Sequence, residues 1–257
     1  MKKMSVLLGF LLVSFSSQAA TLSDCDLLYS HRGTDALKAA DCYQSLVLSV
    51  TDLEEQKKIF TRSFIALSAV VNSMQKTPSE RQAIDKGLAL VKEFSKNFSG
   101  IADFFYWRAC MVSFDVFEKD RGAVIPTHTF KALGAIQSDL RTSIQKDSSI
   151  HFYGPLRVMG MMHTQMPAIA GGDKALAQKL LKEAYEKEPK FSMNHLAYAR
   201  ILDVNGKTDE AIAVLNRLLG ISDQEFDPNA AEPLLSLLPE VLKDKADAKN
   251  LLDDISG

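Results

Sequence analysis

The chain has 257 residues, of which 46% are hydrophobic and 24% charged, with 13 Gly and 8 Pro. This composition is ordinary for a globular protein, and it excludes a collagen-like, mucin-like or disordered chain. The 30 Lys and Arg nearly balance the 32 Asp and Glu, and no run of basic residues occurs, so the sequence argues against a nucleic-acid partner.

The first 19 residues have the pattern of a secretory signal peptide. Lys2 and Lys3 are followed by a short apolar run at 6–15, and Ser17 and Ala19 place small residues at positions −3 and −1 of a cleavage point. An apolar run of about ten residues forms a helix of about 15 Å, which is too short to span a bilayer as an anchor. We therefore expect cleavage after Ala19.

Export to the periplasm follows from that reading. Asp24, directly before Cys25, argues against lipidation of this cysteine, as does its distance from the apolar run. The sequence thus predicts a signal peptide at 1–19 and one helical-repeat domain at 20–257 in a periplasmic protein.

Export permits disulfide bonds. Cys25 and Cys42 are 17 residues apart and flank Gly33. If Gly33 turns the chain between two short helices, the two cysteines meet, and the bond is worth roughly 3 kcal/mol. Cys110 lies in the apolar run 104–111 with no His or acid placed locally to activate it, so a buried inert thiol is favoured over a nucleophile.

Helices are expected along nearly the whole chain, because apolar residues recur at spacings of three and four and strand signals are weak. Pro78 and Pro126 mark helix starts, and short connections favour antiparallel packing of successive helices. The expected helices span residues 23–31, 35–49, 52–74, 79–97, 101–119, 127–146, 153–165, 173–187, 192–204, 208–219, 230–238 and 244–255.

A 34-residue repeat is the sharpest internal pattern. It pairs Gly172 with Gly206, Ala177 with Ala211, Leu181 with Leu215, Ala184 with Leu218, and Pro189 with Asp223. This is the tetratricopeptide period, in which a small residue lets the second helix approach the first. We predict repeats at 156–189 and 190–223, in an all-α fold of stacked antiparallel helical hairpins forming a tetratricopeptide-like right-handed superhelix. The insertion 166–171 in the first repeat is a loop, and such loops often carry binding function.

Several segments carry a family resemblance. The ordered series runs through Ala102–Ala109, Tyr153–Gly160, Met166-Pro167, Gly171–Ala175, Ala184 and Pro189. Together they resemble the T-component family associated with TRAP (tripartite ATP-independent periplasmic) transporters, over roughly residues 80–220. The resemblance implies an exported all-helical protein that partners the periplasmic solute-binding subunit and can oligomerise around pores or clefts.

A ligand or partner cleft is expected between helices 101–119 and 153–165. It would be lined by Tyr106, Trp107, Arg108, Tyr153, Arg157, Met161, His163 and Met166. An arginine at its polar end could clamp a carboxylate, which suits a small amphipathic organic acid or a partner helix. Three alternatives stay open: Trp107 packs in the core, Arg157 pairs with an acid such as Asp173, and the methionines fill the core rather than line a groove.

We find no catalytic constellation and expect no enzyme, cofactor or metal. The five His show no His-x-x-x-His pair, and helical spacing spreads the Met residues near His163 over different faces, which disfavours zinc and copper. The sequence predicts a non-enzymatic accessory or binding protein of TRAP-type uptake. The alternative is a general protein-interaction scaffold of the cell envelope. Another envelope protein and a second copy of the chain are further candidate partners.

Overall fold

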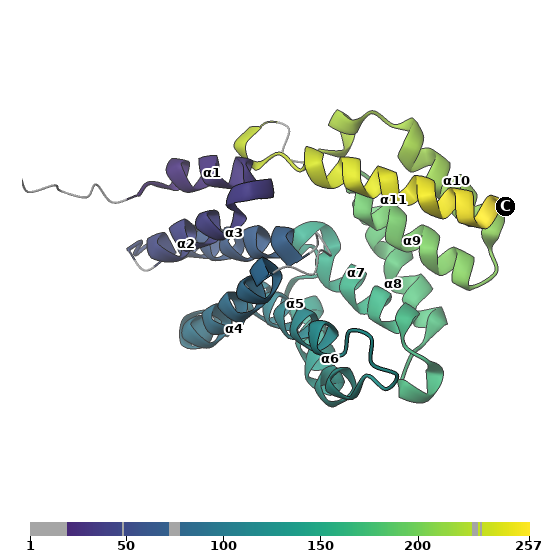
Figure 1. Cartoon of the computed structure of the whole chain (residues 1–257), viewed down its shortest axis with the longest axis horizontal. Coiled ribbons are helices and arrows are strands. Elements are labelled where there is room, and N and C mark those ends of the chain that lie inside the picture. The colour runs from purple at the N-terminus through teal and green to yellow at the C-terminus, as the bar shows by residue number, and fades with distance from the viewer. Residues whose placement is uncertain (1–19, 48, 72–77, 228–230, 232) are drawn as a thin grey trace, which may run out of the picture.

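The computed structural model describes residues 20–47, 49–71, 78–227, 231 and 233–257. The expected signal peptide at 1–19 lies outside these described residues. Within them the chain forms eleven α-helices and three short 3₁₀ helices, with no strand (Figure 1), which confirms the all-α prediction.

The helices follow one another with short connections. Their bounds are α1 Leu22–Ser30, α2 Arg32–Val47, α3 Leu53–Val71, α4 Pro78–Phe98, α5 Ala102–Lys119, α6 Thr127–Asp147, α7 Ile150–Gln165, α8 Lys174–Lys187, α9 Ser192–Val204, α10 Thr208–Gly220 and α11 Leu238–Ser256, with 3₁₀ helices η1 Ala168–Ala170, η2 Asp223–Phe226 and η3 Pro233–Leu235.

The N-terminal hairpin contains the predicted disulfide, although its turn is placed differently. Cys25 and Cys42 are bonded, with their Cα atoms 5.4 Å apart. We expected Gly33 to form the turn, but α1 ends at Ser30 and Gly33 already lies inside α2. The chain reverses at His31, whose backbone N–H bonds back to the carbonyl of Leu28, so a polar C-cap residue performs the role that we assigned to glycine.

The C-terminal prediction was wrong in part. The expected helix at 230–238 is absent from the described part of that segment, which has only the turn η3, and α11 starts at Leu238 rather than at 244. Pro239 occupies the first turn of α11, where its missing N–H costs nothing and its fixed φ suits a helix start. The leucines before Pro239 recur with a helical spacing, which is why we expected a helix at 230–238.

Two hydrophobic cores are stacked along the chain. The first is built by α1–α7 and centres on aromatic side chains such as Phe60, Phe64 and Phe104. The second is built by α8–α11, with Met161 of α7 packed against it. Helix α7 contributes Met159 to the first core, so it joins the two.

The two predicted repeats form the hairpins α7–α8 and α9–α10. Residues that lie 34 positions apart are buried alike: Ala177 and Ala211 are fully buried, as are Leu181 and Leu215 to within 1%. A Cβ added to Gly160 of α7 would lie 2.6 Å from Leu181 of α8, so the absent side chain is what allows these two helices to meet.

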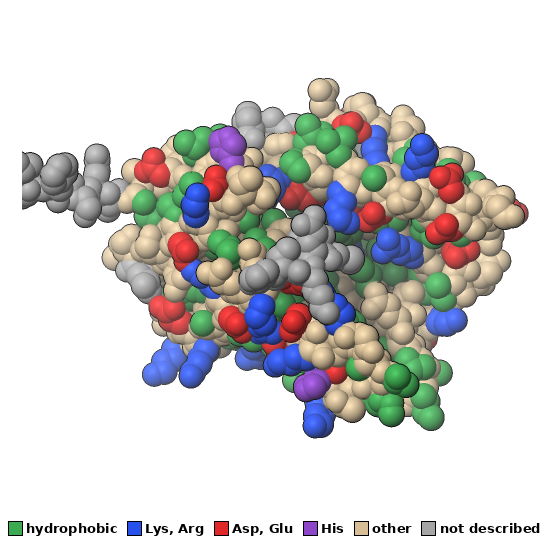
Figure 2. Space-filling model, in the orientation of Figure 1, with side chains coloured by type: hydrophobic (Ala, Val, Ile, Leu, Met, Phe, Trp, Pro, Cys, Tyr) green, Lys and Arg blue, Asp and Glu red, His purple; other side chains and the backbone are tan. Residues whose placement is uncertain are grey.

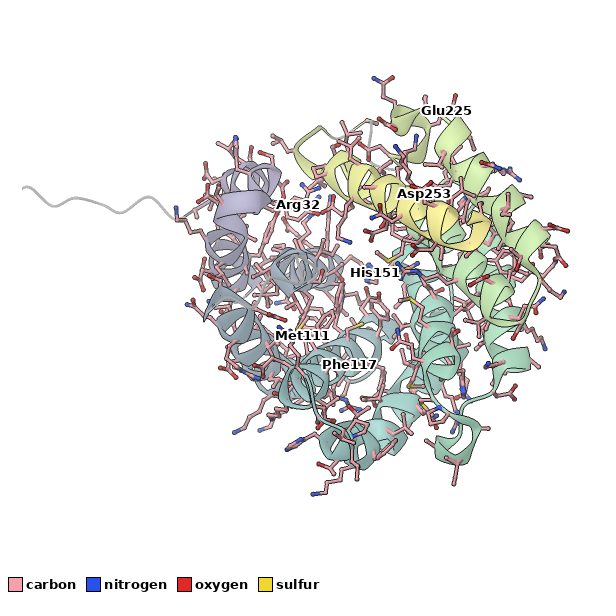
Figure 3. The ribbon with its side chains drawn as sticks, turned by 45° about the vertical axis from the view of Figure 1, so that its right-hand side comes forward. Arg32, Met111, Phe117, His151, Glu225 and Asp253 are labelled. Carbon is pink, nitrogen blue, oxygen red and sulfur yellow. A yellow bond between two sulfur atoms is a disulfide. The ribbon has the colours of Figure 1, made fainter. Side chains whose placement is uncertain are left out.

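The two ends of the helical stack meet. Arg32 at the start of α2 donates through Nε to Glu240 of α11 at 2.6 Å and through Nη2 to the carbonyl of Ser236 at 2.7 Å. A second Nη2 bond joins the same carboxylate, and the guanidinium lies 4.6 Å from the Tyr29 ring. Figures 1 and 3 show α11 returning to the N-terminal helices at this point, so the stack of hairpins closes on itself.

Basic and acidic side chains are interspersed over the face shown in Figure 2, and the net charge of the chain is close to zero. Among the described residues, no helix is both long and apolar enough to cross a membrane.

Replacing Ala211 with leucine tests the repeat register. The added methylenes would overpack the contact of α10 with its neighbours, so the free energy of unfolding should fall by about 1–3 kcal/mol. Lys207→Ala is the matched control, because Lys207 is exposed and pairs with Glu210 on the surface, and it should change stability by less than about 0.5 kcal/mol. Urea denaturation measures both, and equal small effects would contradict the register.

Candidate functional site

A left-handed turn begins α7. His151, Phe152 and Tyr153 have φ values of +50°, +58° and +60°, although none is glycine. A left-handed conformation costs an ordinary residue about 1–2 kcal/mol, so three in succession require support from the surrounding structure. The regular helix of α7 begins only after Tyr153, so Tyr153 and Arg157 do not share one helical face.

Arg157 stabilises the turn through hydrogen bonds to its backbone. Its Nη1 donates to the carbonyl of Phe152 at 3.0 Å, and its Nη2 lies 3.3 Å from the carbonyl of His151. Nη1 also donates to Oδ1 of Asn194 at 2.8 Å. The side chain is only 5% exposed, so these bonds give the backbone carbonyls of the turn a buried donor. Asp173, the partner we considered, is not among these acceptors.

Helix α9 supplies the other side of the support. Asn194 donates through Nδ2 to the carbonyls of Phe152 and Ala184, at 3.2 and 3.0 Å, and so links the turn to the end of α8. Phe191 stacks on Phe152 at 4.6 Å and lies under the Arg157 guanidinium at 4.7 Å. The turn is therefore fixed on the repeat side by an amide, a cation and an aromatic stack.

His151 fixes the turn on the N-terminal side. Its ring stacks on Tyr106 at 5.1 Å and meets Trp107 edge-on at 4.9 Å. Its Nε2 lies 3.1 Å from Oδ1 of Asp103, which also accepts a bond from Thr61. Burial opposes ionisation of Asp103, but the bonds from His151 and Thr61 outweigh it and hold its pKa below the usual value. Figure 3 shows His151 at the centre of the molecule, between its two halves.

The expected cleft between α5 and α7 is filled by side chains. Trp107 is 4% exposed and stacks on Phe64 at 5.5 Å, as the core alternative requires. A Cβ on Gly154 would lie 2.9 Å from the Tyr106 ring, so the helices are in close contact there. Burial raises the pKa values of Tyr106 and Cys110, that of Cys110 to about 12, which keeps this thiol protonated and inert.

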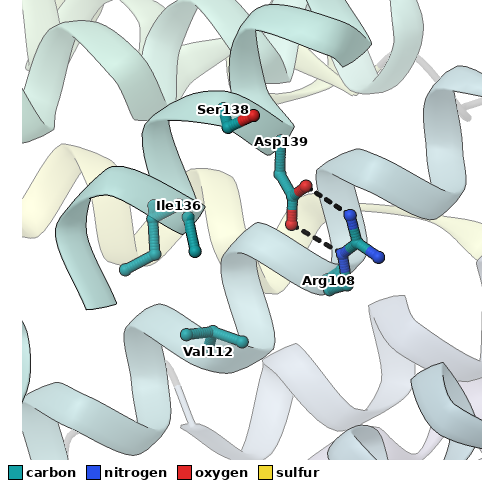
Figure 4. Close-up of a pocket in the computed structure, with 6 residues that line it drawn as sticks. Arg108, Val112, Ile136, Ser138 and Asp139 are labelled. Atoms are coloured by element: carbon teal, nitrogen blue, oxygen red, sulfur yellow. Dashed lines mark hydrogen bonds and ion pairs between the residues drawn. The ribbon is translucent and has the colours of Figure 1, made fainter. Parts of the chain in front are cut away.

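Arg108 faces α6 rather than α7. Its Nε and Nη2 bind the two carboxylate oxygens of Asp139 at 2.6 and 2.5 Å (Figure 4). The pair borders a shallow pocket of about 310 Å³ between α5 and α6, which Val112 and Ile136 also line. Because Asp139 already occupies the bidentate face of the guanidinium, a ligand carboxylate would have to displace it.

The remaining expected residues are dispersed along α7. His163 is 5% exposed, and its Nδ1 has no hydrogen-bond partner among the described residues. Met161 packs against the second core, and Met166 caps α7 with its N–H bonded to the carbonyl of Met162. The structure therefore gathers Tyr106, Trp107 and Arg157 around the turn and leaves the methionines apart from it.

Asp244 of α11 is a buried acid beside this cluster. Its side chain accepts a bond from the hydroxyl of Ser192 at 2.6 Å and is 2% exposed. Burial raises its pKa to about 6, against the opposing effects of Ser192, Lys243 and Arg157. No ion pair of Asp244 occurs within the described part of the chain, so ionisation near neutral pH places an uncompensated charge in the protein interior.

Several residues of the site were not expected from the sequence, among them His151, Phe152, Phe191, Asn194, Asp103 and Asp244. One signal was present for the turn. Pro155 disfavours a helical conformation at the residue before it and is itself well tolerated in the first turn of a helix, so the sequence places the start of regular helix at this point. The other contacts join residues distant along the chain and have no local signal.

Residues 168–228 match the family model described as tetratricopeptide repeat. The chain contains a tetratricopeptide-type repeat. The match spans α8, α9 and α10, which includes the whole α9–α10 hairpin and the second helix of the hairpin before it. No curated protein sequence gives a significant match to the chain. Repeats of this type generally present surfaces for protein–protein contacts, so the finding supports an interaction scaffold.

Replacing Arg157 with methionine tests the support of the turn. Methionine keeps much of the length but removes the guanidinium bonds to the His151 and Phe152 carbonyls and to Oδ1 of Asn194, so the free energy of unfolding should fall by about 3 kcal/mol. Arg108→Met is the control, because that partly exposed ion pair with Asp139 should contribute less than about 1 kcal/mol. Equal losses in urea denaturation would remove Arg157 from this role.

Replacing Asp244 with asparagine tests the buried charge. The native state binds the proton more tightly than the unfolded chain, so the stability contribution of Asp244 falls as pH rises from about 4 to about 6. An asparagine at this position does not ionise and escapes this loss, so we expect the variant to gain up to about 3 kcal/mol at pH 7.5 and little at pH 4. Thermal denaturation at several pH values measures this. Asp253→Asn, at an exposed position of α11, should show no such pH-dependent gain.

Proposed function

We propose that the protein is an exported, non-enzymatic scaffold that binds a periplasmic solute-binding subunit of TRAP-type uptake. The observation that carries the proposal is the tetratricopeptide match at 168–228, which overlaps the segment resembling the T-component family. A repeat module of this kind holds proteins together, and a transport accessory needs that capacity to meet its solute-binding partner.

Two features support export. The pattern of residues 1–19 is that of a signal peptide, and Cys25 is bonded to Cys42. Disulfides persist in oxidising compartments such as the periplasm and are rare in the reducing cytosol. The bond joins α1 to α2 at the end of the stack that contacts α11, and it holds these two helices together there.

The repeat half offers a surface for the partner. Helices α9 and α11 border a shallow pocket of about 240 Å³, lined by Arg200, Asp247, Asn250, Leu251 and Asp254. This lining is mainly polar and carries both signs of charge, which is typical of a rim that recognises a protein rather than of an enclosed small-molecule site.

The alternative is a general interaction scaffold of the cell envelope. The tetratricopeptide match alone favours it, because that match identifies a repeat and not a transporter. The two proposals differ in the partner and not in the binding module.

Isothermal titration with a purified TRAP solute-binding subunit from the same organism separates the two. We expect saturable binding by the mature protein, and at least tenfold weaker binding by an Arg200→Glu variant, which reverses the charge of the α9–α11 surface. Lys182→Glu on α8, away from that pocket, is the control and should bind normally.

Absence of binding to the solute-binding subunit, combined with capture of a different envelope protein that Arg200→Glu abolishes, would support the alternative. Retention of protein in the cytosol, measured by fractionation of cells, would contradict export.

A further inference from the structure

Two connections between helices have an unusual composition. The α5–α6 connection contains Gly122-Ala123-Val124-Ile125-Pro126, and the α7–α8 connection contains Met166-Pro167-Ala168-Ile169-Ala170-Gly171-Gly172. Neither segment holds a charged residue. Surface loops are ordinarily polar and rich in turn-forming side chains, so two apolar loops in one molecule require an explanation.

The side chains at the tips are directed outward. Val124 and Ile169 are each 98% exposed and Ile125 is 64% exposed. Phe117 at the end of α5 and Phe130 at the start of α6 are also exposed beside the first loop. Side chains this exposed protrude from the surface, so they do not form a groove, and a single aliphatic tip gains nothing in water from standing out.

Both loops lie at one end of the molecule. Each joins the first helix of a hairpin to the second, and in a stack of hairpins such connections fall on the same edge. Figures 1 and 3 agree on this placement, since both loops are at the lower end of the two views. Figure 2 shows hydrophobic side chains at the lower right of that end.

Acidic side chains are scarce within the two loops, and the first acid after the α7–α8 loop is the exposed Asp173, the N-cap of α8. Residues 121–138 include Arg121, His128 and Lys131 but no Asp or Glu, and residues 148–172 contain no acid over 25 positions. The acid that precedes the first loop, Asp120, is 9% exposed, because its carboxylate accepts bonds from the backbone N–H groups of His128 and Thr129. An anionic surface that approaches this end would meet little repulsion from negative charge within either stretch.

We propose that the α5–α6 and α7–α8 loops insert their apolar tips into the interface of a phospholipid bilayer that carries anionic headgroups. A fluid bilayer accommodates protruding aliphatic side chains, whereas a protein partner would need a separate pocket for each tip. The compositions differ too, because protein interfaces favour aromatic residues, Met and Arg at their centres, while the most exposed side chains of these loops are the aliphatic Val124, Ile125 and Ile169. Membrane attachment would be peripheral and reversible, since only a few side chains are inserted.

Vesicle co-sedimentation tests this with the mature protein. We expect binding to phosphatidylcholine vesicles that contain phosphatidylglycerol, and weaker binding to phosphatidylcholine alone. Val124→Asp and Ile169→Asp should each weaken the binding by about tenfold, because each removes one inserted aliphatic side chain. Leu242→Asp is the matched control: Leu242 is 50% exposed on α11, away from the loops, and its replacement should leave binding unchanged.

A depth measurement adds a second readout. In a Val124→Trp variant, lipids brominated on their acyl chains should quench the new indole, while the buried Trp107 stays unquenched as an internal reference. Failure to bind either vesicle, binding that both Asp variants retain, or an unquenched indole at 124 would each overturn the proposal. So would self-association that the Asp variants abolish without any vesicle binding, which would assign the tips to a second copy of the chain.

Discussion

The structure depends on one buried guanidinium. Arg157 lies where α7 leaves its left-handed turn, and it donates to two backbone carbonyls of that turn and to Asn194 of α9. These bonds act together with the contacts of Asn194, Phe191 and His151 to offset the strain of three residues with positive φ. The direction of α7 fixes how the second core follows the first, because α7 is the helix that the two cores share. The relative position of the two halves therefore depends on this polar contact as well as on the packing of α7 against both cores.

Arg32 constrains the same geometry at the opposite end of the stack. A chain of helical hairpins is quasi-one-dimensional, so small changes at each step add up, and its ends are ordinarily free. Here Glu240 and Ser236 bond to Arg32 and so connect the last helix to the second. This contact forms only if α7, at Arg157, directs the second half of the chain back towards the first. The disulfide holds α1 to α2 beside that contact. A scaffold closed in this way presents a fixed surface, which lowers the ordering cost when a partner binds.

Local patterns predicted most of the fold. The spacing of apolar residues located the helices from α3 to α10, and the 34-residue pairing of Ala177 with Ala211 identified the two hairpins that the tetratricopeptide family model overlaps. The Cys25–Cys42 pair was predicted from export, the 17-residue separation and two short helices, although the turn lies at His31 and not at Gly33. The candidate site was harder, because Asn194 and Asp244 meet the start of α7 only through tertiary packing. Trp107 and Arg108 are neighbours in sequence, yet one enters the core and the other pairs with Asp139 on α6.

Where a sequence departs from the rules for a stable soluble repeat, function is the usual reason. The departures in this chain fall at two separate places. At the joint, Asp244 is buried without an ion pair among the described residues, which costs stability once its carboxylate ionises. At the loop ends, aliphatic side chains face water although a polar loop would serve connection equally well. The first departure reduces stability where the halves are oriented, and the second reduces solubility at one edge. The proposed protein-binding surface lies on the repeat helices, and the proposed bilayer contact lies at the loop edge. These are different faces, so both can operate in one molecule.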